Sequence, residues 1–324
     1  MTRRRKSQKW LVTLAWGLNI AGLLALLIVV WLAMSGTTVF AADEPTQTTT
    51  PVYGLVATSA PLPYYLPTIT PNPLSTPLEG LLASPTPFAL ASGRRGQVIG
   101  FSAQGRAIDV YTFGQGEKQR LIVAGIHGGY EWNTIALANE LIVFLDEHPE
   151  AIPSDVTLYI IRNMNPDGEA VGHTKEGRTN ANGVDLNRNF PENWQAEWNR
   201  DGCWNDLPTT GGTSPGSEPE TRVIMRFFEA HHIDAVISYH SAALGIFPGG
   251  EPWEADSMRL GEAIAKVASY PYPPLDTGCI YTGTLADYAV SMGAAAVDME
   301  LSNHRDTDFE MNLDVLNVFL NWLR

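Results

Sequence analysis

Side chains that can hold a metal ion follow two apolar segments of the sequence. His127 comes directly after residues 121–126, and Glu131 lies four positions further on. His240 follows the apolar residues 235–239 in the same way. Two imidazoles and one carboxylate, with one coordination position left open, are the usual ligands of a hydrolytic zinc ion. The sequence therefore predicts one zinc ion per domain, held by His127, Glu131 and His240.

A further carboxylate, Glu300, directly follows residues 295–299, another predicted strand. Zinc lowers the pKa of its bound water toward neutrality, and a nearby carboxylate can then take the proton. Taken singly, these residues have simpler explanations, because Glu131 could be a first-turn carboxylate favoured by the helix dipole. Burying several such groups together without a purpose is costly, so we expect a metal site with Glu300 as the general base.

A second pair, His173 and Glu176, also has a spacing that is found in metal sites. This pair lies in a polar stretch that no apolar strand precedes. Metal ligands in an α/β domain are expected at strand ends, so we do not expect this pair to bind the metal.

Hydrophobic patterning predicts the elements that must position these residues. Alternating residues at 97–102 and 107–113 indicate an antiparallel hairpin. Short apolar runs indicate buried strands, and apolar residues at helical spacing indicate amphipathic helices. The predicted strands are 121–126, 156–161, 235–239 and 295–299, and the predicted helices are 131–145, 219–231, 253–268 and 309–323. This alternation predicts an α/β fold, a mixed, mostly parallel central sheet with helices on both faces.

The N-terminal residues 1–42 are basic and then apolar. Five cationic side chains precede an uncharged apolar run, residues 10–34, that is long enough to cross a bilayer. This charge asymmetry places the N-terminus in the cytoplasm and the remainder outside. Val39-Phe40-Ala41 could also be a signal-peptidase site. We therefore expect a transmembrane anchor or a signal peptide, and a catalytic domain that is extracytoplasmic at the cell membrane, or secreted if the segment is cleaved.

Residues 43–93 are rich in proline and threonine. Such a composition cannot form a packed core and predicts an extended linker, although a pro-segment is the alternative. Residues 94–324 remain for a catalytic domain with a substantial core.

The overall charge and the cysteine count exclude some classes of protein. The formal net charge is −14, whereas a nucleic-acid partner would require basic patches. Only two cysteines occur, Cys203 and Cys279, which are too few for a disulfide scaffold. In an exported domain they could form one bridge, and they could equally remain unpaired.

Residues 97–324 resemble the zinc carboxypeptidase family, the M14 metallocarboxypeptidases, in their motifs and in the order of those motifs. The Gly105-Arg106 pair further resembles the bacterial branch of this family. The motifs are Gly125-Ile-His127, Asn165-Pro-Asp-Gly168, Gly183-Val-Asp-Leu-Asn-Arg-Asn-Phe190, Ser217-Glu-Pro-Glu-Thr221, Tyr239-His-Ser241 and Met299-Glu-Leu301.

The resemblance implies the zinc-carboxypeptidase fold and assigns His127 and His240 as the two histidine ligands. Glu131 matches the carboxylate ligand, although the family normally has two residues between the first histidine and this glutamate. Here three intervene, and the Gly128-Gly129 pair can loop out the additional residue.

The resemblance also implies the residues that act on the substrate. Asn187 and Arg188 match the pair that grips the terminal carboxylate, which suits a guanidinium fork. Arg178 matches the arginine that stabilises the tetrahedral oxyanion. Glu300 matches the general base, and Tyr281 matches the mobile tyrosine that closes over substrate. The simpler alternative is that the arginines are salt-bridged and that the tyrosine is structural.

The implied function is that of a zinc-dependent metallocarboxypeptidase acting on a peptide, or a peptidoglycan peptide, with a free C-terminal carboxylate. Selectivity is expected within residues 283–288, where Leu285 would suit a neutral side chain and Asp287 a basic or amine-bearing one. Two alternatives stay open: a zinc-dependent N-acyl amino acid deacylase on the same scaffold, and a catalytically silent peptide-binding domain. Retention of Glu300 disfavours the silent domain, because a pure binder has no use for a buried base.

Overall fold

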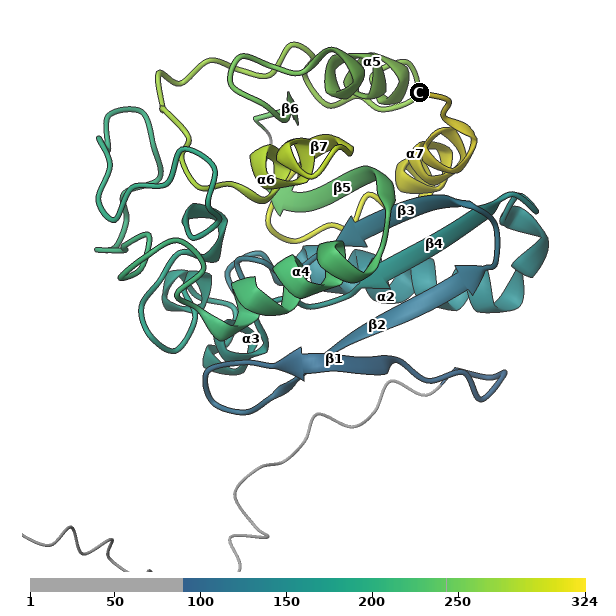
Figure 1. The fold of residues 1–324 in the computed structure, drawn as a ribbon, viewed down its shortest axis with the longest axis horizontal. Coiled ribbons are helices and arrows are strands. Elements are labelled where there is room, and N and C mark those ends of the chain that lie inside the picture. The colour runs from purple at the N-terminus through teal and green to yellow at the C-terminus, as the bar shows by residue number, and fades with distance from the viewer. Residues whose placement is uncertain (1–89, 243) are drawn as a thin grey trace, which may run out of the picture. The chain divides into compact units, whose positions relative to one another are not determined.

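Seven strands form one sheet in the part of the chain that the computed structural model describes, residues 90–242 and 244–324 (Figure 1). The strands are β1 (Gln97–Phe101), β2 (Ala107–Gly114), β3 (Lys118–Val123), β4 (Val156–Ile161), β5 (Ile233–Ser241), β6 (Ile246–Pro248) and β7 (Ala295–Leu301). Their order across the sheet is β1-β2-β4-β3-β5-β7-β6.

The sheet is mixed, as predicted, with a parallel centre and antiparallel pairings toward its edges. Strands β4, β3, β5 and β7 run parallel at the centre, whereas β1–β2, β2–β4 and β6–β7 are antiparallel. A parallel connection needs a crossover of about a dozen residues or more. Only residues 115–117 join β2 to β3, so β2 runs opposite to the central strands.

Helices cover both faces of the sheet, as the alternating pattern predicted (Figure 1). The α-helices are α2 (Trp132–Glu147), α3 (Pro166–Val171), α4 (Pro219–Ala230), α5 (Ala255–Ile264), α6 (Leu285–Ser291) and α7 (Phe309–Asn321), and the short 3₁₀ turns are η1 (Pro149–Ala151), η2 (Lys175–Arg178) and η3 (Leu186–Arg188). Helices α2, α5 and α7 share one apolar cluster with the sheet, and α4 and α6 share the other.

The predicted strands and the four predicted helices all occur, with shifted ends. The predicted helix at 253–268 is shorter, since α5 covers only Ala255–Ile264. The pattern missed the helices α3 and α6, the strand β6 and the three 3₁₀ turns. Strand β6 has too few residues to show an alternating pattern, and α6 begins at a cap in which the Thr284 side chain accepts a hydrogen bond from the Asp287 amide.

The predicted anchor or signal segment, residues 1–42, lies outside the described residues, as does most of the predicted linker. Among the helices that are described, none has the length and apolar character needed to cross a membrane. The division into residues 1–42, 43–93 and 94–324 therefore stays a prediction.

We expect the Leu141→Ala variant to lower the free energy of unfolding by about 3 kcal/mol, because a buried leucine leaves a cavity when truncated. Leu141 is fully buried on the inner face of α2. Val143, exposed on the same helix, is the control, and Val143→Ala should change stability by no more than about 0.5 kcal/mol. Urea denaturation followed by circular dichroism measures both, and equal losses would contradict the inferred orientation of α2.

Candidate active site

Three parallel strands bring the predicted metal and catalytic residues to one edge of the sheet. His127 lies in the connection that follows β3, and His240 is next to last in β5. Glu300 lies near the end of β7 and is paired in register with His240. The carboxyl ends of parallel strands share one edge, which is where sites in open α/β sheets are found. The expected placement of these three residues is therefore observed.

The connection from His127 to Glu131 accommodates the additional residue through a tight turn. Gly128 adopts a left-handed φ of 46°, and its amide donates to the Gly125 carbonyl at 3.0 Å. The Glu131 carbonyl then accepts from both the amide and the hydroxyl of Thr134, which fixes the start of α2. Glu131 consequently reaches the site despite its displaced position in the sequence.

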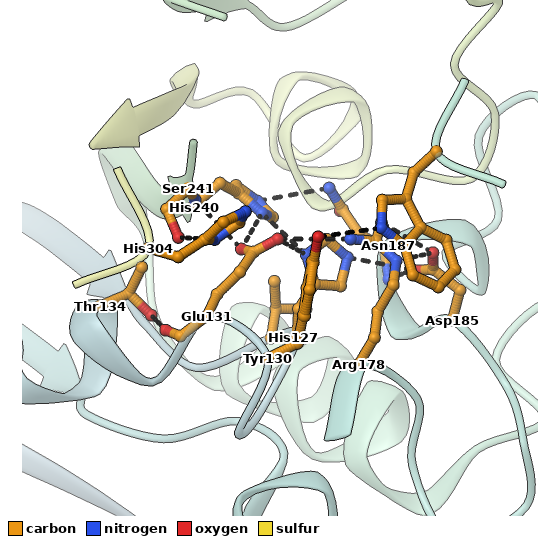
Figure 2. A network of polar contacts seen from close by, with 12 residues as sticks. His127, Tyr130, Glu131, Thr134, Arg178, Asp185, Asn187, His240, Ser241 and His304 are labelled. Atoms are coloured by element: carbon orange, nitrogen blue, oxygen red, sulfur yellow. Dashed lines mark hydrogen bonds and ion pairs between the residues drawn. The ribbon is translucent and has the colours of Figure 1, made fainter. Parts of the chain in front are cut away.

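The three predicted ligands converge, as Figure 2 shows, and one ligand atom from each lies within 4.8 Å of the others. The Nδ1 atom of His127 is 2.7 Å from Glu131 Oε1, and His240 Nδ1 is 3.3 Å from Glu131 Oε2. The two Nδ1 atoms are 3.3 Å apart. All three side chains are buried.

The donor set fits a zinc ion. The opposite nitrogen of His127, Nε2, lies 3.1 Å from the Asp185 carboxylate, and His240 Nε2 lies 3.0 Å from the Ser238 hydroxyl. A hydrogen on each Nε2 leaves a lone pair on each Nδ1. These two lone pairs and the Glu131 carboxylate face one another, an arrangement that a bound cation stabilises. Two imidazoles and one carboxylate also leave a fourth position open, as in hydrolytic zinc sites.

Charges in the site shift the pKa values of its carboxyl groups in opposite directions. Burial would raise the pKa of Glu131, but His127 and His240 hold it below its ordinary value. Burial raises the pKa of Glu300, and the neighbouring Glu131 carboxylate adds to the shift. Glu300 Oε2 is buried and has no hydrogen-bond partner among the described residues. A carboxyl group in these surroundings binds a proton more readily than an exposed glutamate does.

Asp185 joins the metal centre to the predicted oxyanion arginine, and sequence reasoning gave it no role. Its Oδ1 faces His127 Nε2, and its Oδ2 lies 2.9 Å from Arg178 Nη2. Burial would raise the pKa of Asp185, but Arg178 and His127 hold it well below the ordinary value. Its place two residues before Asn187, inside the quoted motif, was the signal that could have found it.

The two predicted arginines both lie in the site, in different electrostatic surroundings. Arg178 pairs with Asp185 and, at 3.3 Å, with Glu131 Oε1. Arg188 is also buried, but it forms no ion pair with any carboxylate in the described segments, and its Nε has no hydrogen-bond partner. Asn187 lies beside it and is fixed by the Leu285 amide, which donates to Asn187 Oδ1 at 2.8 Å.

A cavity of about 1280 Å³ contains the metal ligands, both arginines, Asn187 and Glu300. Tyr281 lines this cavity as expected, and so does Asp287. Leu285, the predicted alternative for setting selectivity, is buried in the core under α6 and does not line the cavity. The rejected pair His173 and Glu176 is absent from the metal cluster in the described region, and His173 instead stacks on Trp132 at 4.4 Å.

Cys203 and Cys279 form a disulfide, which resolves the alternative left open by the sequence. Both cysteines line the cavity. The bridge joins the segment between η3 and α4 to the segment that carries Tyr281.

We expect the purified protein to hold about one zinc ion per chain and the His240→Ala variant to lose it, because two remaining ligands do not retain zinc well. The matched control is His173→Ala, which removes an imidazole outside the cluster and should keep the metal. Inductively coupled plasma mass spectrometry after dialysis measures both. Full zinc occupancy in His240→Ala would show that the metal lies elsewhere.

Comparisons with known proteins found several that are similar to this chain. Murein peptide amidase A of Escherichia coli K12 is 35% identical over 157 residues, which is 47% of this chain and 58% of the amidase. The catalytic chain of human carboxypeptidase N is 29% identical over 204 residues, 54% of this chain and 43% of that protein. The chain thus spans about half the length of these relatives. The crystal structure of the murein-tripeptide amidase from Escherichia coli O157 aligns with a TM-score of 0.53 and 26% identity, covering 70% of this chain and 92% of that one.

Residues 94–311 match the family model described as zinc carboxypeptidase. Zinc is the metal of that family, so the predicted cofactor is confirmed, and the predicted class, zinc metallopeptidase, is the class of the family. By this match and by the grouped ligands His127, Glu131 and His240, the chain belongs to the zinc carboxypeptidase family.

Proposed function

We propose that the protein is a zinc-dependent carboxypeptidase that hydrolyses the last amide bond of a peptide with a free C-terminal carboxylate. Arg188 is the observation that carries this proposal. A buried cation without a carboxylate partner is costly unless a ligand supplies the anion. Arg188 lines the cavity that holds the metal ligands, so a carboxylate bound there would place the adjacent amide near the metal.

The surroundings of Arg188 suit a terminal carboxylate. Burial lowers the pKa of its guanidinium, and the Asp185 carboxylate opposes that shift. The Arg188 Nη1 donates to the Asn187 carbonyl at 2.7 Å, which orients the fork. Bidentate hydrogen bonds between a guanidinium and a carboxylate are among the stronger polar contacts in proteins. Asn187 and Arg188 therefore bind and orient the end of the substrate.

A zinc ion held by His127, Glu131 and His240 would supply an activated water and polarise the scissile carbonyl. Glu300 then accepts the proton of the attacking water and returns it to the leaving amine. The Arg178 guanidinium, fixed by Asp185, places positive charge where the oxyanion develops, which can lower the barrier by about 3 kcal/mol. Tyr281 closes over the bound peptide from the segment beside the disulfide.

The substrate class that we favour is a bacterial cell-wall peptide. The relatives include a murein peptide amidase and a murein-tripeptide amidase, whose names state that substrate. Asp287 lines the cavity and favours a terminal residue with a basic or amine-bearing side chain. We also propose that the domain acts outside the cytoplasm, at the membrane or secreted. The disulfide supports this, since such bonds persist in oxidising compartments.

We expect the wild type to cleave peptides with a free C-terminus and to spare the same peptides as C-terminal amides. The Arg188→Gln variant should lower kcat/KM about 100-fold, since it removes a charged hydrogen-bonding partner of the carboxylate. Arg226→Gln, an exposed arginine on α4, is the matched control and should behave as wild type.

Chromatographic assays of product release would measure these rates on a panel ending in lysine, leucine or diaminopimelate. Efficient hydrolysis of N-acyl amino acids with no cleavage of any peptide would replace this proposal with a deacylase. Binding of peptides without hydrolysis in the zinc-loaded protein would replace it with a binding domain.

The pH dependence tests the role of Glu300. The base must be deprotonated to accept a proton, so hydrolysis should fall as the pH drops through the raised pKa of Glu300. The acidic limb of kcat/KM should therefore lie above about 4.3, the pKa of an ordinary glutamate. Glu300→Gln should reduce kcat by at least about 100-fold and keep its zinc. Undiminished hydrolysis in that variant would exclude Glu300 as the base.

A further inference from the structure

Two tryptophans from one irregular segment face the two arginines of the site. The segment lies between η3 and α4 and carries Trp198 and Trp204. Trp204 lies over the Arg178 guanidinium, with its ring centroid 4.6 Å from Cζ. Trp198 lies over Arg188 at 5.3 Å. Each guanidinium thus lies over an aromatic ring.

Covalent and polar contacts fix this segment against the rest of the site. Cys203, directly before Trp204, is bonded to Cys279. A Cβ on Gly202, which has a φ of 71°, would collide with the Thr277 carbonyl, so the two backbones meet directly beside the bridge. The Trp204 indole nitrogen donates to the Tyr130 hydroxyl at 3.2 Å.

Tyr130, whose hydroxyl accepts this hydrogen bond, belongs to the lengthened connection between two of the metal ligands. Tyr130 is the last of the three residues between His127 and Glu131, where the family normally has two. Its ring lies edge-on to Trp204, with centroids 5.7 Å apart, and 4.7 Å from the ring of His304. The lengthened metal-binding turn therefore supports Trp204 from one side, and the disulfide holds it from the other.

We propose that the segment between η3 and α4, which the disulfide tethers to the rest of the site, is a clamp that positions both arginines, with Trp204 acting on Arg178 and Trp198 on Arg188. This inference rests on the proposed function, since it concerns the arginines assigned there. An aromatic ring over a guanidinium attracts the charge and excludes water from that face, while the edge keeps its N–H donors free for a ligand.

The two arginines need the clamp for different reasons. The edge of Arg178 is already held by Asp185 and Glu131, so Trp204 fixes the remaining freedom, the tilt of the plane. Arg188 has no carboxylate partner among the described residues, and Trp198 together with Tyr281, at 5.2 Å, covers it instead. Trp198 also carries Arg200 on its ring, which holds the indole in place. Trp204 should therefore affect the transition state, and Trp198 the binding of the substrate.

Kinetics of the zinc-loaded enzyme on a peptide with a free C-terminus test this division. We expect Trp204→Leu to lower kcat about tenfold with KM changed by less than about twofold. Trp198→Leu should raise KM about tenfold with a smaller change in kcat. Trp194→Leu is the matched control from the same segment; its indole donates to the Gly211 carbonyl and should leave both constants unchanged.

Binding measurements separate positioning from general damage to the fold. Calorimetry should show weaker binding of a phosphonate transition-state analogue to Trp204→Leu, with unchanged binding of the free amino acid product. Trp198→Leu should weaken both ligands. Trp204→Phe keeps a ring over Arg178 and should retain most of the wild-type kcat. If Trp204→Leu does not fold, Trp204→Phe takes its place in the comparison. Removal of the bridge by Cys203→Ser should reproduce both defects.

Several results would overturn the clamp. One such result is that kcat and KM are unchanged in both Trp204→Leu and Trp198→Leu. Another is that kcat and KM change equally in these two variants and in Trp194→Leu. A third is that Trp204→Phe is as impaired as Trp204→Leu. Failure of the proposed function would look different, because the wild type itself would then cleave no peptide. In that case, unaltered binding of carboxylate ligands by Trp198→Leu would still refute the clamp.

Discussion

Asp185 contacts His127 and Arg178 at once, so one buried carboxylate orients a metal ligand and the guanidinium proposed to face the oxyanion. Its position is itself fixed, because Oδ1 also accepts from the Asn187 amide at 3.1 Å. The metal ligands and the residues proposed to bind substrate are therefore parts of a single hydrogen-bonded network. A carboxylate that pairs with both a histidine and an arginine is costly to bury unless all its lone pairs are used, and here they are.

Much of this site could be predicted from the sequence, because its residues directly follow strands. Each of these strands is recognised from the hydrophobic pattern of its own few residues. The apolar run before His127 and the run before His240 identify two strands of a parallel sheet, and parallel strands end at one edge. Glu300 was located by the same reasoning, and its register with His240 follows from the β5–β7 pairing. The strand directions at the sheet edges were harder to predict, because those of β2 and β6 depend on short connections and not on the hydrophobic pattern.

Other parts of the site depend on contacts between distant segments, which periodicity cannot show. The role of Asp185 depends on partners from two other segments of the chain, and the pairing of Cys203 with Cys279 depends on two irregular segments meeting. Leu285 shows the opposite error: its neighbours in the sequence, Thr284 and Ala286, line the cavity, but the Leu285 side chain packs in the core. The rotation of α6, set by its cap at Thr284, decides which of its side chains reach the cavity.

The disulfide also determines what happens when a protease cleaves the chain between its two cysteines. Its two cysteines are 76 positions apart, and the span between them contains α4, β5 and α5. Closing a loop of this length lowers the conformational entropy of the unfolded chain. In the chain-entropy model this raises the free energy of unfolding by about 4 to 5 kcal/mol. A peptide bond broken in an exposed turn of this span leaves both fragments covalently joined, with His240 still attached to the rest of the site. A single cut in this span would therefore not release either half of the site.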